Sequence, residues 1–336
     1  MAGGERALPD VRTVSPDLVV PPLRSKARPA AGVRTTLRHA DSRGNAEHIL
    51  YLPRDWHPAN SNRSEPRYPV LVELAGNGPY KDAFGDVSTG RVDGSSMGFG
   101  LSSGVGCIWL CLPYLDESGD AVRQWWGSPP DHDPRPTIDY AIRTVRAVCR
   151  DYNGDSERVV LMGFSRGAIA CNFIGLHGPE IAMLWCGFLA FSHYDGVRQW
   201  PYPGSDRVAA TRRLSYLADR PQLIMSEDPR TGSLHELQMG GQLDETRRYL
   251  ELVAPAATAA GQFTFLSCGF RNHNDSWSLR ACAARDQARA WLSTLLKQSI
   301  GVPQASRAAV AHAPKTPHDK TRMGGRARDS RCKGRL

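Results

Sequence analysis

Short apolar runs alternate with amphipathic stretches along most of the chain. The runs that predict buried strands are 33–40, 46–52, 70–75, 107–113, 159–162, 184–190, 223–225 and 263–266. Stretches with apolar residues at three- and four-residue spacing predict helices at 137–151, 166–176, 206–217, 242–253 and 279–298. A repeated order of strand then helix is typical of an α/β domain, with a doubly wound, mostly parallel sheet and helices on both faces.

One segment between two predicted strands departs from this pattern. Residues 85–106 contain seven glycines and five serines, which indicates a long mobile or functional loop. We expect the α/β domain to span residues 34–300. A flexible segment, 1–33, would precede it, and a basic, disordered tail, 301–336, would follow it.

The net charge of +8 comes from the two ends of the chain. Residues 301–336 hold nine Lys or Arg against two Asp, and residues 1–34 hold six basic residues against three acidic ones. The 27 basic and 29 acidic residues that remain nearly cancel. Nucleic acid is therefore not a predicted partner of the domain. The alternative is that the basic tail alone binds nucleic acid or another anionic partner. The oligomeric state is left open.

Neither a membrane span nor a cofactor is predicted. No apolar run approaches the roughly 18 residues of a transmembrane helix. The stretch from Asp17 to Leu23 is short and broken by proline, and acidic residues near the start disfavour a transit peptide, so the predicted location is the cytoplasm. The eight cysteines include no C-x-x-C pair and predict free thiols, and no His/Cys cluster has the spacing of metal ligands.

Three matches to the pattern G-x-S-x-G offer a candidate nucleophile. Those centred on Ser96 and Ser102 lie in the glycine-rich segment, with no predicted strand before them. The third, G-F-S-R-G around Ser165, follows the apolar run R-V-V-L-M and leads into a predicted helix. A sharp turn from strand to helix exposes the serine oxygen above the sheet, so Ser165 is the predicted nucleophile.

A serine hydroxyl needs a base, and the base needs a group that orients it. His273 follows the last predicted strand and is the expected base, with His193 as a rival. The preceding strand leads into S-E-D-P, which offers Glu227 and Asp228 as the acid. We choose Asp228 because the proline after it favours a rigid turn and its side chain is the shorter of the two. Glu227 stays open as the alternative.

An oxyanion hole needs two backbone N–H groups near the nucleophile. One is expected from Arg166, the residue after Ser165. The other is expected from the A-G-N-G loop after the strand at 70–75, where Asn77 or Gly78 is the predicted donor.

Taken together, these motifs resemble the α/β-hydrolase superfamily over residues 34–300. Within it, the chain is most similar to the polyhydroxybutyrate-depolymerase-like and feruloyl- or acetyl-esterase-like branch. The resemblance implies a serine esterase with a Ser-His-Asp triad and an acyl-enzyme intermediate, acting on a small-molecule or polymeric ester. The oxyanion loop departs from the family pattern because it lacks an H-G-G start, and Arg166 stands where relatives usually have a small or aliphatic residue, Gln or His.

Aromatic residues on the loops after the strands are the candidates for substrate binding. They are Trp125, Trp126, Tyr194 and Trp277. Such side chains either pack a lid or bind the flat face of a ligand, which weakly favours an aryl or sugar ester as substrate. A peptidase or acyltransferase using the same residues is an alternative, as is an inactive hydrolase fold that serves as a binding protein.

Overall fold

A mixed sheet forms the centre of the molecule. The computed structural model describes residues 8–59, 67–227 and 243–298, and within them nine strands follow the order β1-β2-β3-β7-β4-β10-β11-β12-β13. Only the pairs β2–β3 and β3–β7 in this sheet are antiparallel. The strands are β1 (Leu23–Arg24), β2 (Arg34–Leu37), β3 (His48–Tyr51), β4 (Tyr68–Leu74), β7 (Ile108–Leu112), β10 (Gly154–Phe164), β11 (Gly187–Phe191), β12 (Gln222–Ser226) and β13 (Phe263–Ser267).

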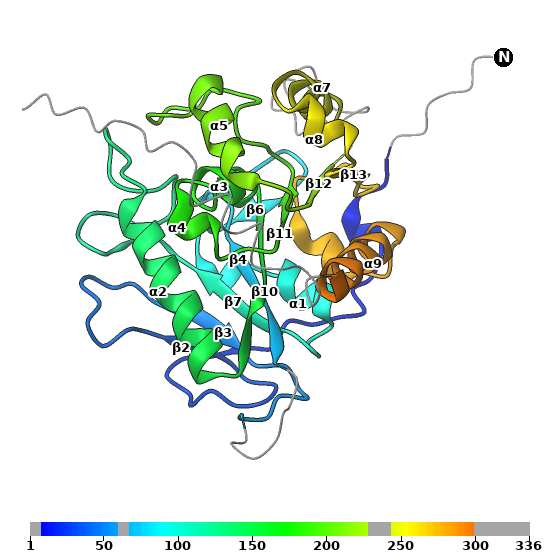
Figure 1. The fold of residues 1–336 in the computed structure, drawn as a ribbon. Helices are drawn as coiled ribbons and strands as arrows, with labels where there is room; N and C mark the ends of the chain where they lie inside the picture. The colour runs from blue at the N-terminus through cyan, green and yellow to red at the C-terminus, as the bar shows by residue number, and fades with distance from the viewer. Residues whose placement is uncertain (1–7, 60–66, 228–242, 299–336) are drawn as a thin grey trace, which may run out of the picture.

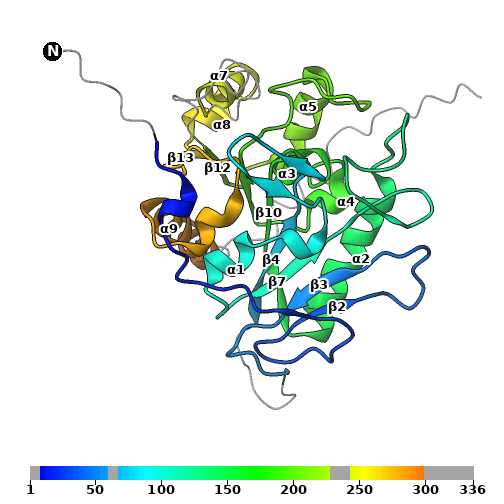
Figure 2. The ribbon, with the colours of Figure 1, turned by 180° about the vertical axis from the view of Figure 1, so that it is seen from behind.

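Helices cover both faces of the sheet, as Figures 1 and 2 show from opposite sides. Helices α1 and α9 pack together on one face, and α2, α3 and α4 lie on the other. The helices are α1 (Met97–Ser102), α2 (Arg135–Asp151), α3 (Arg166–Phe173), α4 (Pro179–Ala182), α5 (Arg207–Leu214), α7 (Leu243–Val253), α8 (Pro255–Ala259) and α9 (Ala283–Gln298). Two small hairpins, β5–β6 (Tyr80–Lys81 and Val87–Ser88) and β8–β9 (Tyr114–Leu115 and Ala121–Val122), lie outside the main sheet.

The central strands are apolar throughout because both of their faces are buried. In β10, Val159 and Leu161 pack into the core under α2 and α3, whereas Val160 and Met162 pack into the core under α9. Continuous apolar runs are typical of parallel strands between two helical layers. The predicted doubly wound α/β class is confirmed, and each predicted strand overlaps an observed one.

The start of the described chain differs from the flexible segment that we predicted. Val11 is fully buried, and β1 pairs in parallel with β2. Asp17 forms an ion pair with Arg285 of α9 at 2.5 Å, and both ribbon views draw this part of the chain beside α9. The sequence pattern did not predict this packing because the contacts come from single residues in a stretch rich in proline.

The glycine-rich segment also differs from the prediction, because it contains a buried helix. Helix α1 lies within it, and its first turn is held by Glu73 of β4. The Glu73 carboxylate accepts hydrogen bonds from the backbone N–H groups of Ser96, Met97 and Gly98. A Cβ on Gly98 would lie 2.2 Å from Trp109, so glycine here allows close packing on the sheet. The glycines therefore serve close packing as well as turns.

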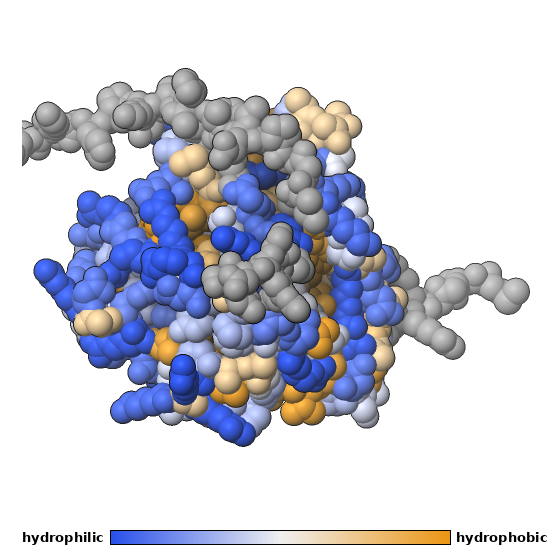
Figure 3. Space-filling model, turned by 60° about the horizontal axis from the view of Figure 1, so that its bottom comes forward, coloured by the Kyte–Doolittle hydropathy of each residue, from blue (hydrophilic) through white to orange (hydrophobic). Residues whose placement is uncertain are grey.

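Hydrophilic residues occupy most of the described surface in the view of Figure 3, with smaller hydrophobic areas between them. None of the helices in the described part of the chain has the length and apolar character needed to cross a bilayer. The predicted basic tail, 301–336, lies outside the described residues.

Candidate active site

Ser165 occupies a sharp turn between β10 and α3. Its backbone has φ 56° and ψ −115°, a conformation that costs energy for any residue with a Cβ. Two glycines make the turn possible. A Cβ on Gly163 would lie 2.2 Å from the Gly167 backbone, and one on Gly167 would lie 1.9 Å from the carbonyl oxygen of Leu74. The G-F-S-R-G motif thus presses the strand and the helix together and presents the serine at the carboxyl edge of the sheet.

His273 lies between Ser165 and an acidic side chain. Its Nε2 is 3.0 Å from Ser165 Oγ, and its Nδ1 is 2.8 Å from Glu227 Oε1. The three residues follow β10, β12 and β13, so the parallel sheet brings their loops to one edge. When Nδ1 donates its proton to Glu227, Nε2 is free to accept the proton of the serine hydroxyl.

The acid beside His273 is therefore Glu227, whereas the sequence analysis chose Asp228. Asp228 lies outside the described residues. Glu227 directly follows β12, and the longer Glu side chain reaches the imidazole from this position. Neither a following proline nor a shorter side chain decides this contact, because the direction in which the chain leaves β12 sets which side chain faces the imidazole.

Ser192, which the sequence analysis did not single out, adds a further hydrogen bond to Glu227 on this side of His273. Its hydroxyl donates to Glu227 Oε1 at 2.9 Å and lies 3.0 Å from His273 Nδ1. Its backbone, at φ 91°, lies in the region that favours glycine. A lone serine after β11 carries no motif, so no sequence signal marked it. The strained backbone points the hydroxyl at the carboxylate.

The charges of Glu227 and His273 shift each other's pKa values. Burial lowers the pKa of His273, but the charge of Glu227, their hydrogen bond and the charges of Asp86 and Asp82 together raise it by more, so the pKa lies above its ordinary value. Burial raises the pKa of Glu227, but the charge of His273, their hydrogen bond and smaller contributions from His193 and a backbone hydrogen bond together lower it by more, so the pKa lies below the ordinary value. The pair therefore favours an ionised carboxylate and an imidazole that protonates readily.

The loop after β4 runs close to the serine. A Cβ on Gly76 would lie 3.4 Å from the Cβ of Ser165. In this loop the Gly78 N–H donates to the Arg123 carbonyl oxygen at 2.9 Å, so the predicted donor Gly78 is already engaged. The Asn77 side chain accepts from the Trp125 N–H at 2.9 Å, while the Asn77 N–H has no acceptor among the described residues. The Arg166 N–H, at the first position of α3, has no carbonyl partner within its helix.

Three of the four aromatic residues predicted to bind substrate are core residues. Trp126 is fully buried and stacks on Phe173 at 4.2 Å between ring centroids. Trp277 is fully buried under the sheet, and Tyr194 is buried with its hydroxyl donating to Gln222. These large aromatic rings fill the space between helices and sheet in this structure, and their role in substrate binding stays a prediction.

Trp125 remains a candidate for substrate contact. It is partly exposed, and its ring lies 5.2 Å from that of Trp200 and 4.9 Å from that of Tyr202. Trp200 in turn lies 5.4 Å from His193, whose ring is 5.3 Å from that of His273. Neighbouring aromatic and imidazole rings thus connect His273 to the partly exposed Trp125.

The competing candidates occupy structural positions. Burial lowers the pKa of His193 to about 3, so this rival base stays neutral beside His273. Asp195, the next acid after the same strand, forms a buried ion pair with Arg213 at 2.9 Å. Ser96 begins α1, and the Ser102 hydroxyl donates to the Gly98 carbonyl at 2.8 Å. Neither of these serines has a histidine partner within the described residues.

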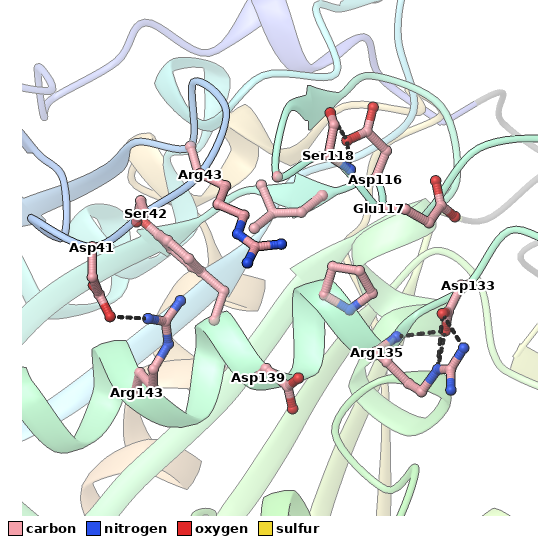
Figure 4. A pocket seen from close by; sticks show the side chains of 15 residues that line it. Asp41, Ser42, Arg43, Asp116, Glu117, Ser118, Asp133, Arg135, Asp139 and Arg143 are labelled. Atoms are coloured by element: carbon pink, nitrogen blue, oxygen red, sulfur yellow. Dashed lines mark hydrogen bonds and ion pairs between the residues drawn. The ribbon is translucent and has the colours of Figure 1, made fainter.

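A separate hollow of about 560 Å³ lies away from these residues, between α2 and the loops at 41–46 and 115–119. Figure 4 shows two ion pairs among its charged side chains: Arg143 faces Asp41, and Arg135 faces Asp133. Its lining includes none of Ser165, His273 and Glu227. Among the residues that the structure describes, no three His, Cys, Asp or Glu side chains gather in a way that could hold a metal ion.

No family model and no curated protein sequence matches the chain. Solved structures do match. An S-formylglutathione hydrolase from Agrobacterium tumefaciens superimposes with a TM-score of 0.51 at 14% identity, over 80% of this chain and 98% of that one. A fluorophosphonate-binding serine hydrolase from Staphylococcus aureus gives a TM-score of 0.49 at 13% identity, over 80% and 99% of the two chains.

A thermostable esterase gives a TM-score of 0.44 at 15% identity, and the match covers 78% of this chain but only 62% of the esterase. At these identities a likeness bears on the fold alone. The hydrolase from Agrobacterium matches over nearly its whole length, and the mostly parallel nine-stranded sheet of the described residues agrees with that likeness. The chain therefore has an α/β-hydrolase fold.

Proposed function

We propose that the protein is a serine hydrolase that cleaves carboxylic esters through an acyl-enzyme. The observation that carries this proposal is the continuous hydrogen-bonded series of Ser165 Oγ, His273 Nε2, His273 Nδ1 and Glu227 Oε1. A serine at a strained turn, next to a neutral base that is oriented by a carboxylate, has the arrangement required for nucleophilic catalysis.

In the first half of the reaction, Ser165 attacks the ester carbonyl and its proton passes to His273 Nε2. The carbonyl oxygen becomes an oxyanion, and the backbone N–H groups of Arg166 and Asn77 are the proposed donors to it. Glu227 stabilises the imidazolium that forms. When the tetrahedral intermediate collapses, the C–O bond to the alcohol breaks and His273 gives its proton to the leaving oxygen.

In the second half, water replaces the alcohol. His273 takes a proton from the water as the water attacks the acyl carbonyl, and the second tetrahedral intermediate passes through the same oxyanion donors. Its collapse releases the carboxylic acid, and the proton held by His273 returns to Ser165. The partly exposed Trp125 supports, as a proposal, an aryl group on the substrate.

The direct test is hydrolysis of p-nitrophenyl acetate and of a panel of aryl, acetyl-sugar, feruloyl and hydroxyacyl esters. Ser165→Ala should lower turnover by about 10⁴-fold or more, because it removes the nucleophile and little packing. Ser102→Ala is the matched control, because Ser102 is also the central serine of a G-x-S-x-G pattern but lies in the glycine-rich segment. It should leave turnover near the wild-type value. Equal activity of Ser165→Ala and wild type would exclude this serine as the nucleophile.

A further inference from the structure

Arg166 has a second feature besides its backbone N–H: its side chain is a buried cation at the base of the site. The residue is 1% exposed, and its guanidinium has no carboxylate partner within the described residues. It donates instead to backbone carbonyls, through Nη1 to Trp125 at 2.6 Å and through Nη2 to Gly76 at 2.9 Å. Its Cζ also lies 3.8 Å from the centre of the Tyr114 ring.

A buried cation without a counter-ion costs free energy, and an apolar side chain would fill the same space without that cost. Burial lowers the pKa of Arg166 to about 10, so the guanidinium still carries its charge at neutral pH. Carbonyl dipoles and the face of the Tyr114 ring offset part of the cost. Only a planar group with several donors can join carbonyls from separate segments in this way.

The segments that Arg166 joins form the wall beside the nucleophile. Longer contacts add the carbonyls of Ala75 at 3.5 Å and Gly90 at 3.3 Å to those of Gly76 and Trp125. Ala75 also accepts from the Tyr114 hydroxyl at 3.1 Å. The guanidinium therefore holds the loop after β4, the loop at Gly90 and the loop at Trp125 together.

The contact with Gly76 fixes one peptide plane in particular. The Gly76 carbonyl and the Asn77 N–H belong to the same planar trans peptide, so the two groups point in opposite directions. Holding the carbonyl toward Arg166 therefore holds the N–H of Asn77 in a fixed direction. The Asn77 side chain and the Gly78 N–H are engaged elsewhere, whereas the Asn77 N–H has no acceptor among the described residues.

We propose that the guanidinium of Arg166 is a positioning group for the oxyanion-binding peptide. Arg166 would then have two roles. Its own backbone N–H is one donor to the oxyanion, and its side chain holds the second donor, the N–H of Asn77, in place. This inference rests on the proposed function. It also gives a physical reason for an arginine at a position where the resemblance implies a smaller or uncharged residue.

Substitution of Arg166 should therefore weaken the binding of the transition state and leave the binding of the substrate unchanged. The oxyanion forms only after attack, so a misdirected Asn77 N–H should lower kcat and leave KM nearly unchanged. Removing one oxyanion donor outright costs about 10²- to 10³-fold in kcat. A donor that is present but misaligned should cost less, about 10- to 100-fold.

The experiment compares Arg166→Gln and Arg166→Lys with Arg34→Gln in the full chain. Arg34 is the matched control because it is also buried, donates to a backbone carbonyl, that of Asp93, and lies over an aromatic ring, that of Trp109. Each variant is measured for kcat and KM on p-nitrophenyl acetate, for thermal midpoint, and for inhibition by phenylboronic acid, whose adduct with a serine is tetrahedral. Arg166→Lys keeps the charge but loses the planar set of donors, and it serves if Arg166→Gln does not fold.

For the Arg166 variants we expect kcat to fall by about 10- to 100-fold, KM to stay within about threefold, and the boronate Ki to rise by the same factor as kcat falls. Arg34→Gln should lower the thermal midpoint and leave kcat within about twofold. If the wild type is active and the Arg166 variants lose only thermal stability, this inference is overturned while the proposed function stands. A lower kcat with an unchanged boronate Ki would have the same consequence. A wild type without ester turnover would overturn the proposed function, and this inference with it.

Discussion

The carboxylate of Glu227 lies 2.8 Å from Nδ1 of His273, on the opposite side of the imidazole from Ser165. This contact places the first of the two adjacent acidic residues after β12 beside the imidazole. It also explains why the pKa of His273 lies above its ordinary value although the side chain is buried. The hydroxyl of Ser192 also donates a hydrogen bond to this carboxylate oxygen, at 2.9 Å.

Glu227→Gln should keep the fold and lower ester turnover by about 10⁴-fold, because an amide no longer favours the tautomer in which Nε2 can accept the serine proton. The adjacent substitution, Asp228→Asn, is the matched control and should cost less than about tenfold. Both are measured as kcat/KM on one ester. A larger loss in Asp228→Asn would return the role of the acid to that residue.

Activity should rise with pH through a pKa above the ordinary value of 6.5, because only the neutral imidazole accepts the serine proton and the charge of Glu227 raises the pKa of His273. In Glu227→Gln the pKa of His273 should move down, since burial then acts without the opposing charge. Titration of the His273 ring by NMR measures this without turnover. A pKa that stays the same or rises in Glu227→Gln would argue against the pairing.

The same pKa shifts predict how stability changes with pH. The raised pKa of His273 contributes stability that is fully present below its unfolded value, about 6.5, and is lost as pH rises through the folded value. The lowered pKa of Glu227 contributes stability above its unfolded value, about 4.5, which is lost as pH falls through the folded value. The free energies of unfolding of wild type and Glu227→Gln are measured in urea across pH 4 to 9. The difference between the two proteins should be largest in the middle of this pH range and smaller toward pH 4 and toward pH 9.

Ser192→Ala should lower kcat/KM by about tenfold or less, because it removes one hydrogen bond to Glu227 but leaves the contact between Glu227 and His273. Its effect should largely disappear in the Glu227→Gln background, since the hydroxyl acts through that carboxylate. A double-mutant cycle on the two positions tests this. Fully additive losses would mean that Ser192 acts independently of Glu227.

Gly167→Ala should destabilise the fold by about 1–3 kcal/mol or more, because the added Cβ would lie 1.9 Å from the carbonyl oxygen of Leu74. Gly178→Ala is the control, since nothing lies within 4 Å of a Cβ there. Its cost should stay below about 1 kcal/mol. Equal unfolding free energies for the two variants, measured in urea, would show that the turn does not need glycine at 167.

The fold could be read from the sequence because its strands are buried on both faces and its helices are amphipathic. The runs around Val159–Met162 and Leu223–Met225 carry that signal directly. The placement of Ser165 followed from a motif in its structural context, and that of His273 from its position after the last strand. Both placements depend on the order of strands and helices along the chain, and the hydrophobic pattern of the sequence shows that order.

The rest of the site depends on geometry that no local pattern encodes. Whether Glu227 or Asp228 reaches His273 is set by the direction of the chain after β12, and the hydroxyl of Ser192 is aimed by a strained backbone. The guanidinium of Arg166 finds its acceptors on three loops that are distant in sequence. Trp126 and Trp277 lie in the core, and a loop position in the sequence does not reveal whether a ring points into it.

The central claim is that Ser165 is a nucleophile activated by His273, and labelling with a fluorophosphonate tests it most directly. The reagent should form one adduct per chain, and peptide mapping by mass spectrometry should place it on Ser165. We expect no adduct in Ser165→Ala, labelling slowed by at least about 10³-fold in His273→Ala, and normal labelling in Ser96→Ala. Folded wild-type protein that takes up no label, or that is labelled on another serine, would contradict the account.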